Sequence, residues 1–408
     1  MSLVGPATTA QGLRVVAFSS FYPHSARLGS HSTSLAWLLL QSPRVASITF
    51  FGNAGSSLPP GFDPARLEVV EAWTPDRPIS LVRCALRMAR RARETDVFLF
   101  NIYVTSFGRS PATNAIGLLL PIAVRRLTRR PTVAYVHNLV ETQDIDRLGY
   151  SDRSFAVRVA RTLERLLARN VRLVVPLESQ AETARRSLGA PVECVVIPFA
   201  EGAFAASSAL ATSSGSPSGA SPDGKLRVLL FGFWGPQKDL AGTLRTLAER
   251  IDRRHDVSVT VAGGVNPSFP DYAEEFRALR ARYDSADIRF VGPVEELATF
   301  DLFRSHDVLL LAYRASGGTS GVMNLGALAG LRIVASGLPQ LEELARELEL
   351  PLTVYDARDP LGLEQALDRA VADGRTGSRS TPAEIRGRLE RARDRAFELL
   401  TPPGRPRA

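Results

Sequence analysis

The sequence has little of what marks a secreted or membrane-spanning protein. Only two of its 408 residues are cysteines, Cys84 and Cys194, and buried thiols in a reducing compartment are the simplest interpretation. No apolar run reaches the roughly 18 to 20 residues that a membrane span needs. The longest candidate runs only from Ile116 to Val124. No basic segment precedes an apolar core at the N-terminus, so we expect no secretion signal and a cytoplasmic location.

The sequence also lacks a recognisable nucleic-acid-binding motif, although its formal net charge is +8. Acidic residues are interleaved with the arginines, and we expect no nucleic-acid partner. Two interpretations of the excess charge stay open. One is an arginine-rich composition without a partner. The other is attraction of the clusters Arg87–Arg93 and Arg125–Arg130 to an anionic membrane, which would place the protein peripherally at the inner membrane face.

No G-x-G-x-x-G follows the first apolar run, which argues against a dinucleotide-binding domain. What the chain does contain is a regular alternation of short apolar runs with helical patterns. This alternation is typical of parallel sheets covered on both faces. The strand-like runs are Val15–Phe18, Ser47–Phe51, Leu67–Val70, Val97–Phe100, Val133–Val136, Arg172–Val175, Leu226–Phe231, Ser258–Ala262, Ile288–Val291, Val308–Leu311, Ile333–Ala335 and Leu352–Tyr355.

One small, polar and aperiodic segment, AASSALATSSGSPSGASPDG at 205–224, interrupts the alternation. It carries too little apolar surface to order itself, so we interpret it as flexible. The sequence therefore predicts a first Rossmann-like domain over 1–202, a linker over 203–225, a second Rossmann-like domain over 226–381, and a C-terminal helix and tail over 382–408. The predicted fold class is α/β, with two domains facing a cleft and the last helix packing back toward the first domain.

The most informative stretch is YRASGGTSGVMNLGALAGLRIVAS, from Tyr313 to Ser336. A small, glycine-rich turn leads into a helix and then into a short apolar strand. The first N–H groups of such a helix are unpaired, and together with the helix dipole they favour a phosphate or diphosphate. A flexible loop capping a buried helix is the alternative. Lys238, in the loop after the first strand of the second half, supplies a point charge suited to a phosphate.

Taken in order, these segments resemble the GT-B glycosyltransferases, in particular the retaining family-4 group that includes sucrose synthase. GFWGPQKD at 232–239 is similar to the family's G-R-x-x-x-x-K-G, with Phe233 in place of the arginine. FVGPV at 290–294 resembles F-x-G-x-V, and HDVLLLAY at 306–313 resembles A-D-V-x-x-x-P. Leu325–Ser336 resembles the helix and strand E-A-x-A-x-G-x-P-V-V-A-S. The likeness is specific in the second half of the chain and loose in the first.

The resemblance implies a role for each matching residue. The residues expected to bind the donor diphosphate are Lys238, Ser320, Gly321, Val322 and Gly29. The residues expected to contact the nucleotide are Gly232, Val291, Gly292, Val294 and Tyr313. The expected catalytic residues are His137, which follows the strand Val133–Val136, and Lys238. Polar residues expected on the acceptor side are Asn101, Arg109, Glu141 and Asp144.

The chain departs from the family at one point. The family's paired glutamates would fall near Gly317 and Leu325, and neither residue is acidic. Ser320-Gly321-Val322 looks like a variant with S-G-V at the helix start that shows the same loss. Two alternatives to an active transferase therefore stay open: a non-catalytic homologue that binds nucleotide sugars, and a sugar-nucleotide epimerase of the same fold.

The expected activity is that of a hexosyltransferase-type enzyme, which moves a sugar from a nucleoside diphosphate sugar to a hydroxyl acceptor. Retention of configuration is implied by the family. Because no Asp-x-Asp motif stands on a loop near the expected diphosphate, we expect no metal, and the nucleotide sugar is a co-substrate, not a cofactor. The expected acceptor belongs to polysaccharide or lipid-linked oligosaccharide assembly.

Overall fold

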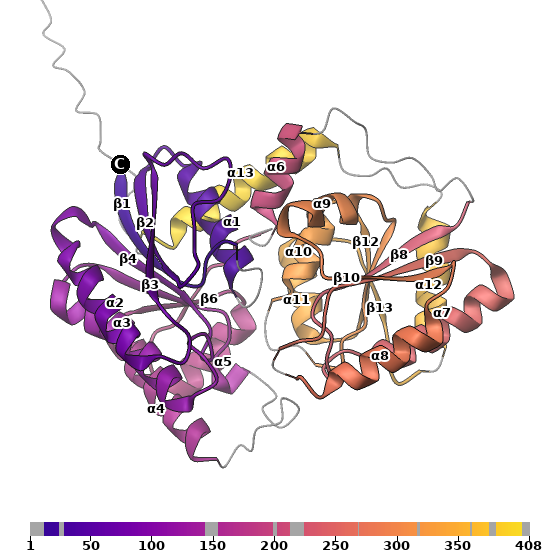
Figure 1. The fold of residues 1–408 in the computed structure, drawn as a ribbon, viewed down its shortest axis with the longest axis horizontal. Helices are drawn as coiled ribbons and strands as arrows, with labels where there is room; N and C mark the ends of the chain where they lie inside the picture. The colour runs from indigo at the N-terminus through magenta and orange to yellow at the C-terminus, as the bar shows by residue number, and fades with distance from the viewer. Residues whose placement is uncertain are drawn as a thin grey trace, which may run out of the picture.

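The computed structural model describes residues 12–23, 28–142, 154–198, 202–212, 224–267, 269–315, 319–359, 361–374 and 381–401. Two parallel sheets form two lobes that lie side by side, with helices on both faces of each sheet (Figure 1). The apolar runs of the sequence become these strands because both faces of a parallel sheet are buried. All four residues of Val308–Leu311, for example, are buried. The predicted α/β class with two Rossmann-like lobes is confirmed.

The first sheet has seven strands in the order β3-β2-β1-β4-β5-β6-β7. Its strands are β1 (Leu13–Phe18), β2 (Val45–Asn53), β3 (Leu67–Trp73), β4 (Val97–Ile102), β5 (Thr132–Val136), β6 (Arg172–Val175) and β7 (Glu193–Cys194). Its helices are α1 (Gly29–Leu40), α2 (Pro78–Arg90), α3 (Pro111–Thr128), α4 (Phe155–Asn170) and α5 (Glu178–Leu188), with 3-10 turns η1 (Ala92–Glu94) and η2 (Val140–Thr142).

The second sheet has six strands in the order β10-β9-β8-β11-β12-β13. Its strands are β8 (Leu226–Phe231), β9 (Val257–Ala262), β10 (Ile288–Gly292), β11 (Val308–Leu311), β12 (Arg332–Ser336) and β13 (Leu352–Tyr355). The helices of this half are α7 (Leu240–Arg254), α8 (Tyr272–Tyr283), α9 (Glu296–Arg304), α10 (Gly321–Leu328), α11 (Pro339–Glu347) and α12 (Gly362–Gly374).

One apolar core runs through both lobes. It joins residues of α1 on the first sheet to residues of α10 and α11 on the second. The outer faces have cores of their own, the first lobe with α2 to α5 and the second with α7, α8 and α12. The lobes are therefore held together by buried apolar surface as well as by the chain connection.

The connection between the lobes differs from the prediction. Residues 203–212 form helix α6 (Ala203–Thr212), so the expectation of a flexible linker is wrong for this part. Its apolar residues, including Phe204 and Ala206, are buried against α1 and α9. Alanine-rich composition lowered the apparent hydrophobicity of the segment, but alanine is the best helix former and packs closely. Residues 213–223 lie outside the described part of the chain.

The last helix, α13 (Pro382–Glu398), crosses back to the first lobe, as predicted (Figure 1). It packs on α1, and Arg172 of β6 donates a 2.7 Å hydrogen bond to the carbonyl of Leu399 at its C-terminal end. An arginine at this position satisfies carbonyl groups that a helix end leaves unpaired.

Each sheet changes winding direction once, and this position determines where ligands collect. In the first sheet the change falls between β1 and β4, and in the second between β8 and β11. Ligands of open α/β sheets bind outside the carboxyl ends of the strands at such switch points. The loops that follow these four strands therefore decide what the protein binds.

Candidate functional site between the two sheets

A cavity of ≈490 Å³ lies between the lobes, at the carboxyl ends of both sheets. The second lobe contributes the loops after β8, β9, β10 and β11 and the start of α10. The first lobe contributes the start of α1 and the loop after β4. Its lining residues are Ser30, His31, Tyr103, Gly202, Ala205, Phe231, Gly232, Phe233, Gln237, Lys238, Gly263, Gly264, Pro293, Val294, Thr299, Tyr313, Ala315, Thr319, Ser320, Gly321, Val322 and Leu325. Both switch points thus open into one cavity.

The lining residues from the second lobe form the C-terminal wall of this cavity, and those from the first lobe form its N-terminal wall. Lys238 is held in the C-terminal wall by backbone and aromatic contacts. Its Nζ donates a 3.2 Å hydrogen bond to the carbonyl of Phe231. The same atom lies 4.9 Å from the ring centroid of Trp234 and 5.1 Å from that of Tyr313. Aromatic faces attract a cation through their quadrupole. Among the described residues, Lys238 makes no ion pair with a carboxylate, so its charge stays available to a ligand.

The surroundings of Lys238 disfavour its charged form while the cavity is unliganded. Burial lowers the pKa of the Lys238 ammonium to about 7, because apolar and aromatic groups replace water without supplying a counter-charge. An anion in the cavity would raise this pKa again. The lysine is therefore poised to take up a proton when an anion binds.

Gly232 makes the close approach of Lys238 possible. Its φ is +121°, a conformation that L side chains rarely adopt. A Cβ at this position would lie 2.6 Å from Nζ of Lys238. The predicted glycine of the GFWGPQKD loop is thus required both for the turn and for the position of the ammonium group.

The first turn of α10 lies beside Lys238. Ser320 is the N-cap of this helix, and its Oγ accepts a 3.2 Å hydrogen bond from the Met323 N–H. The hydroxyl of Tyr313 lies 3.2 Å from the same oxygen. The helix has no acidic residue in its first turn, so its dipole and its free N–H groups favour an anion. Ser320, Gly321 and Val322 all line the cavity, as does Tyr313.

The N-terminal wall presents a second helix start. Leu28 is the N-cap of α1 and offers no side-chain hydrogen bond, and the first turn has no acidic residue. Ser30 and His31 of this turn line the cavity. The predicted diphosphate residue Gly29 opens the helix just before them. Two helix N-termini, one from each lobe, thus open onto one cavity.

Four side chains at and behind this wall form a buried hydrogen-bonded group. Asn101, at the end of β4, has its Nδ2 3.1 Å from Nδ1 of His31 and 2.9 Å from Oγ of Ser32. Its Oδ1 lies 2.7 Å from Nε2 of His137, which follows β5. The two imidazole rings are in edge contact, with centroids 4.3 Å apart. Burial lowers the pKa of both histidines, that of His31 to about 3.

This arrangement places His31, and not the predicted His137, at the cavity. His137 is 2% exposed and does not line the cavity, whereas His31 does. In the sequence His31 stands in a polar stretch after the first apolar run, where a surface loop histidine is common. It is instead the third residue of α1, on the side that faces β4 and β5. The small residues Gly29, Ser30 and Ser32 around it were the available signal, because they let the helix start pack close to the sheet.

The predicted nucleotide-binding residues divide into two groups. Gly232, Val294 and Tyr313 line the cavity. Val291 and Gly292 do not: Val291 is half exposed, and Gly292 accepts a 2.6 Å hydrogen bond through its carbonyl from the N–H of Gly263, a lining residue. Gly292 therefore supports the cavity floor, and Val291 stays a prediction.

The predicted acceptor-side residues are not brought together. Asn101 is buried in the histidine group described above. Arg109 is exposed, away from the lining, and its N–H donates to Asp76. Glu141 forms a 2.6 Å ion pair with Arg161 of α4. Asp144 lies outside the described residues. These acceptor-side roles stay predictions.

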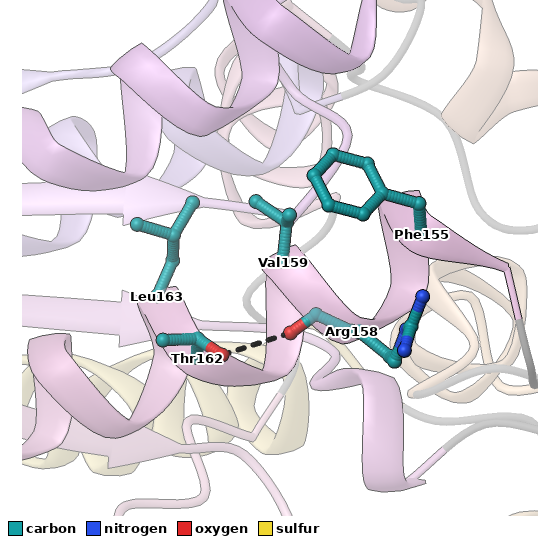
Figure 2. Close-up of a pocket in the computed structure, with 5 residues that line it drawn as sticks. All are labelled: Phe155, Arg158, Val159, Thr162 and Leu163. Carbon is teal, nitrogen blue, oxygen red and sulfur yellow. Dashed lines mark hydrogen bonds between the residues drawn. The ribbon is translucent and has the colours of Figure 1, made fainter.

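A second, shallower hollow of ≈360 Å³ lies on the outer side of the first lobe, along α4 (Figure 2). It is lined by Phe155, Arg158, Val159, Thr162 and Leu163. In Figure 2 the apolar side chains of Phe155, Val159 and Leu163 extend from the same side of the helix. All of these residues belong to α4, and the charged one among them, Arg158, is exposed. The described lining of this hollow thus lacks the buried charge and the second helix start of the cavity between the lobes.

Comparison with solved structures shows which known fold this architecture matches. No family model matches the chain, and no curated protein is similar to it in sequence. Sucrose-phosphate synthase from Thermosynechococcus elongatus is similar over 95% of each chain, with a TM-score of 0.62 and 13% identity. Anabaena HepE in complex with UDP and glucose is similar over 95% of this chain and 97% of its own, with a TM-score of 0.60 and 14% identity. The chain has the GT-B fold.

Other GT-B structures agree with this assignment. The catalytic domain of starch synthase IV from Arabidopsis thaliana, bound to ADP and acarbose, is similar over 95% of this chain and 99% of its own, with a TM-score of 0.58 and 12% identity. Identities this low establish the fold alone. What this GT-B protein binds is decided by the residues of its own cavity.

None of the described helices is long and apolar enough to cross a membrane. No aspartate or glutamate is among the described residues that line the cavity. An apolar lining residue, Leu325, packs against Gly202, whose φ is +92°. The polar side chains of the described cavity lining are thus Lys238, His31, Gln237 and several hydroxyl groups, to which the backbone N–H groups of the helix starts are added.

Proposed function

We propose that this protein is a glycosyltransferase that moves a sugar from a nucleoside diphosphate sugar to a hydroxyl acceptor. The observation that carries the proposal is the convergence of Lys238 and two helix N-termini on one cavity whose described lining holds no carboxylate. A diphosphate is the part of a sugar nucleotide that needs such a site, because its charge must be neutralised where water is excluded.

The same groups account for catalysis. The leaving diphosphate gathers negative charge as the glycosidic bond breaks. Donors and a cation that are already in position stabilise this charge more in the transition state than in the ground state. Protonated Lys238, with the Ser320 hydroxyl and the N–H groups of Gly321 and Val322, is positioned for that role. Lys238 also supplies the positive charge for which a metal ion would otherwise be required, which supports metal-independent transfer.

Retention of configuration and a polysaccharide or lipid-linked acceptor are parts of the same proposal. They rest on the family resemblance of the sequence. The GT-B neighbours named above include structures with bound UDP and glucose or ADP and acarbose, which supports a nucleotide-linked donor. Product stereochemistry, read by NMR of the transferred sugar, tests retention directly.

A panel of nucleoside diphosphates and their sugars, added without metal, tests the donor site by thermal shift. We expect one base to stabilise the protein selectively, because a ligand that binds only the folded state raises its stability. Lys238→Ala should lose this shift. If no nucleotide stabilises the wild-type protein, the proposed function is wrong.

A non-catalytic nucleotide-sugar-binding protein is the second candidate. It is favoured by Leu325, an apolar residue of the cavity near the position where the family resemblance places a glutamate. Slow hydrolysis of the bound sugar nucleotide separates the two candidates. A transferase transfers its sugar to water at a measurable rate, and Lys238→Ala should abolish that rate, whereas a binding protein should show none above background.

We further propose that the first lobe contacts an anionic membrane through α2, α3 and α4, which form one outer layer of this lobe (Figure 1). Exposed apolar side chains lie on all three helices, among them Ile79 at 67%, Leu127 at 58% and Phe155 at 76% exposure. Exposed arginines accompany them: Arg83 and Arg90 on α2, Arg125 and Arg126 on α3, and Arg158, Arg165 and Arg169 on α4. The acidic residue in these helices, Glu164, is buried. Apolar groups among unopposed arginines fit an anionic lipid surface.

Sedimentation with vesicles tests this contact. The protein should bind phosphatidylglycerol vesicles and not pure phosphatidylcholine vesicles, and added salt should weaken binding. Phe155→Ser with Ile79→Ser should reduce it several-fold. Leu361→Ser, at a residue 57% exposed in the second lobe, is the matched control. Equal binding of all variants, or no binding to anionic vesicles, would contradict the proposal.

A further inference from the structure

The buried group of His31, Asn101 and His137 carries an inference about the proposed donor site, and therefore rests on the proposed function. Both imidazoles are nearly inaccessible, at 3% and 2% exposure, and they come from different elements, α1 and the end of β5. Asn101 lies between them and contacts both. An asparagine side chain has one donor group and one acceptor group, so its orientation fixes the hydrogens of both rings.

The contacts of Asn101 favour one assignment of these hydrogens. If its Nδ2 donates to Nδ1 of His31 and to Oγ of Ser32, its Oδ1 accepts from Nε2–H of His137. The remaining polar atom of His137 is then Nδ1, which is buried without a hydrogen-bond partner. In the opposite assignment this nitrogen would carry a hydrogen, and a buried N–H without a partner is rarer than an under-satisfied acceptor.

The consequence concerns the nitrogen of His31 that is not bound to Asn101. Both imidazoles are uncharged near neutral pH, since burial lowers the pKa of His31 to about 3 and that of His137 well below its ordinary value. An uncharged ring carries one N–H. With Nδ1 of His31 acting as an acceptor, that hydrogen sits on Nε2. His31 lines the cavity, and within the described part of the chain Nε2 has no hydrogen-bond partner.

We propose that Asn101 fixes His31 in its Nε2–H form, so that His31 donates a hydrogen bond from the N-terminal wall to an oxygen of the sugar nucleotide. His31 is then the ligand-contacting histidine of this protein. His137 is a positioning residue that acts on it through Asn101. Neither histidine serves as a general base, because the nitrogen of each that could accept a proton is either hydrogen-bonded by Asn101 or buried.

Nitrogen-15 NMR of histidine-labelled protein tests the assignment without any activity measurement. The chain has five histidines, so their signals can be assigned by single substitutions. His31 and His137 should show the Nε2–H form and should not titrate between pH 5 and 8. His306 is an internal reference of the opposite form, because its Nδ1 lies 2.7 Å from the Leu302 carbonyl and must donate. An Nδ1–H signal for His31, or its titration near pH 6.5, would overturn the proposal.

Substitutions test the contact with the ligand. His31→Phe keeps a flat ring without the donor and should lower kcat/KM by about 10- to 100-fold. His31→Gln, whose amide nitrogen can replace Nε2, should recover most of this loss. Asn101→Ala should give a mixture of the two His31 forms in the NMR spectrum and an intermediate loss. His306→Gln, at a buried histidine outside the cavity, is the matched control and should retain kcat/KM.

The affinities of these variants distinguish the oxygen that accepts the bond. Loss of affinity for both the nucleoside diphosphate and its sugar indicates a phosphate oxygen, and loss for the sugar nucleotide alone indicates a sugar hydroxyl. Unchanged kcat/KM and affinities in folded His31→Phe would overturn this inference while leaving the proposed function intact. Failure of the wild-type protein to bind any nucleotide would instead overturn the proposed function.

Discussion

The two walls of the cavity carry polar groups of different character. The C-terminal wall holds Lys238, whose charge is free of any carboxylate among the described residues and whose pKa is lowered to about 7. The N-terminal wall holds His31, an uncharged ring whose hydrogen-bonding form is set by Asn101. One wall therefore responds to the charge of a ligand and to pH, and the other does neither.

This difference has a physical origin in the packing of the two walls. Lys238 is surrounded by aromatic rings and a single carbonyl. These groups hold its ammonium without a counter-charge, so Lys238 can lose its proton near neutral pH. His31 and His137 are enclosed by the sheet and by each other, so a charge on either would be buried without a counter-ion. We infer that the C-terminal wall supplies most of the binding energy for the diphosphate, whereas the N-terminal wall supplies orientation.

The largest expected effect comes from removing the charge of the C-terminal wall. Lys238→Met keeps the aliphatic length without the ammonium, and we expect affinity for the nucleoside diphosphate to fall about 10- to 100-fold, the value of a charge-assisted hydrogen bond. Isothermal titration calorimetry measures the change. Lys225→Met is the matched control, since Lys225 is the other lysine of the chain and pairs with Asp287 at 2.5 Å outside the cavity. Equal affinities of the two variants would remove the distinction between the walls.

The next effect concerns pH. Because the free protein loses the Lys238 proton near pH 7 and a bound diphosphate requires it, affinity should be constant below pH 7. Above that it should fall by up to about tenfold per pH unit. Lys238→Arg should abolish this dependence, since arginine stays protonated. A fall in affinity as the pH is raised from 5 to 7 would indicate that a histidine loses its charge in this range. That result would contradict the uncharged N-terminal wall.

A smaller effect is expected from the helix cap beside Lys238. Ser320→Ala removes both the cap of α10 and a hydroxyl of the cavity. It should cost about 1 kcal/mol of folding free energy and lower diphosphate affinity about threefold to tenfold. Thr381→Ala is the matched control. It removes the N-cap of α13, where the Thr381 hydroxyl accepts a 3.2 Å hydrogen bond from the Glu384 N–H. This control should lose similar stability with unchanged affinity, and a loss of affinity there would show that the Ser320 effect is only structural.

The C-terminal wall could be predicted from the sequence because its elements are local. Lys238 and Gly232 stand in one loop, and Ser320 to Val322 begin one helix. Backbone geometry of a strand followed by a loop and a helix fixes their direction without knowledge of the rest of the fold. All twelve predicted strand runs became strands for the same reason, since short buried runs of a parallel sheet are legible locally.

The N-terminal wall could not be predicted in this way. His31, Asn101 and His137 are 70 and 36 residues apart in sequence and meet only because β1, β4 and β5 are neighbours in the sheet. Nothing local separates a histidine in a loop from one buried at a helix start. Helix α6 was missed because tertiary contacts with α1 and α9 order a segment that is too poor in large apolar residues to suggest order on its own.

The smallest expected effect tests whether the two walls must act together. Glu343 of α11 accepts hydrogen bonds across the lobes from the Ser179 hydroxyl and, at 3.1 Å, from the Ser179 N–H at the start of α5. Glu343→Ala removes this contact far from the cavity, so diphosphate affinity, which depends on the C-terminal wall, should be unchanged.

The rate of transfer requires both walls, so kcat/KM of Glu343→Ala should fall a few-fold. Glu347→Ala, at an exposed residue on the same helix, is the control and should change neither quantity. A fall in diphosphate affinity in Glu343→Ala would mean that the C-terminal wall depends on the position of the other lobe. The binding and orienting roles would then no longer belong to separate walls.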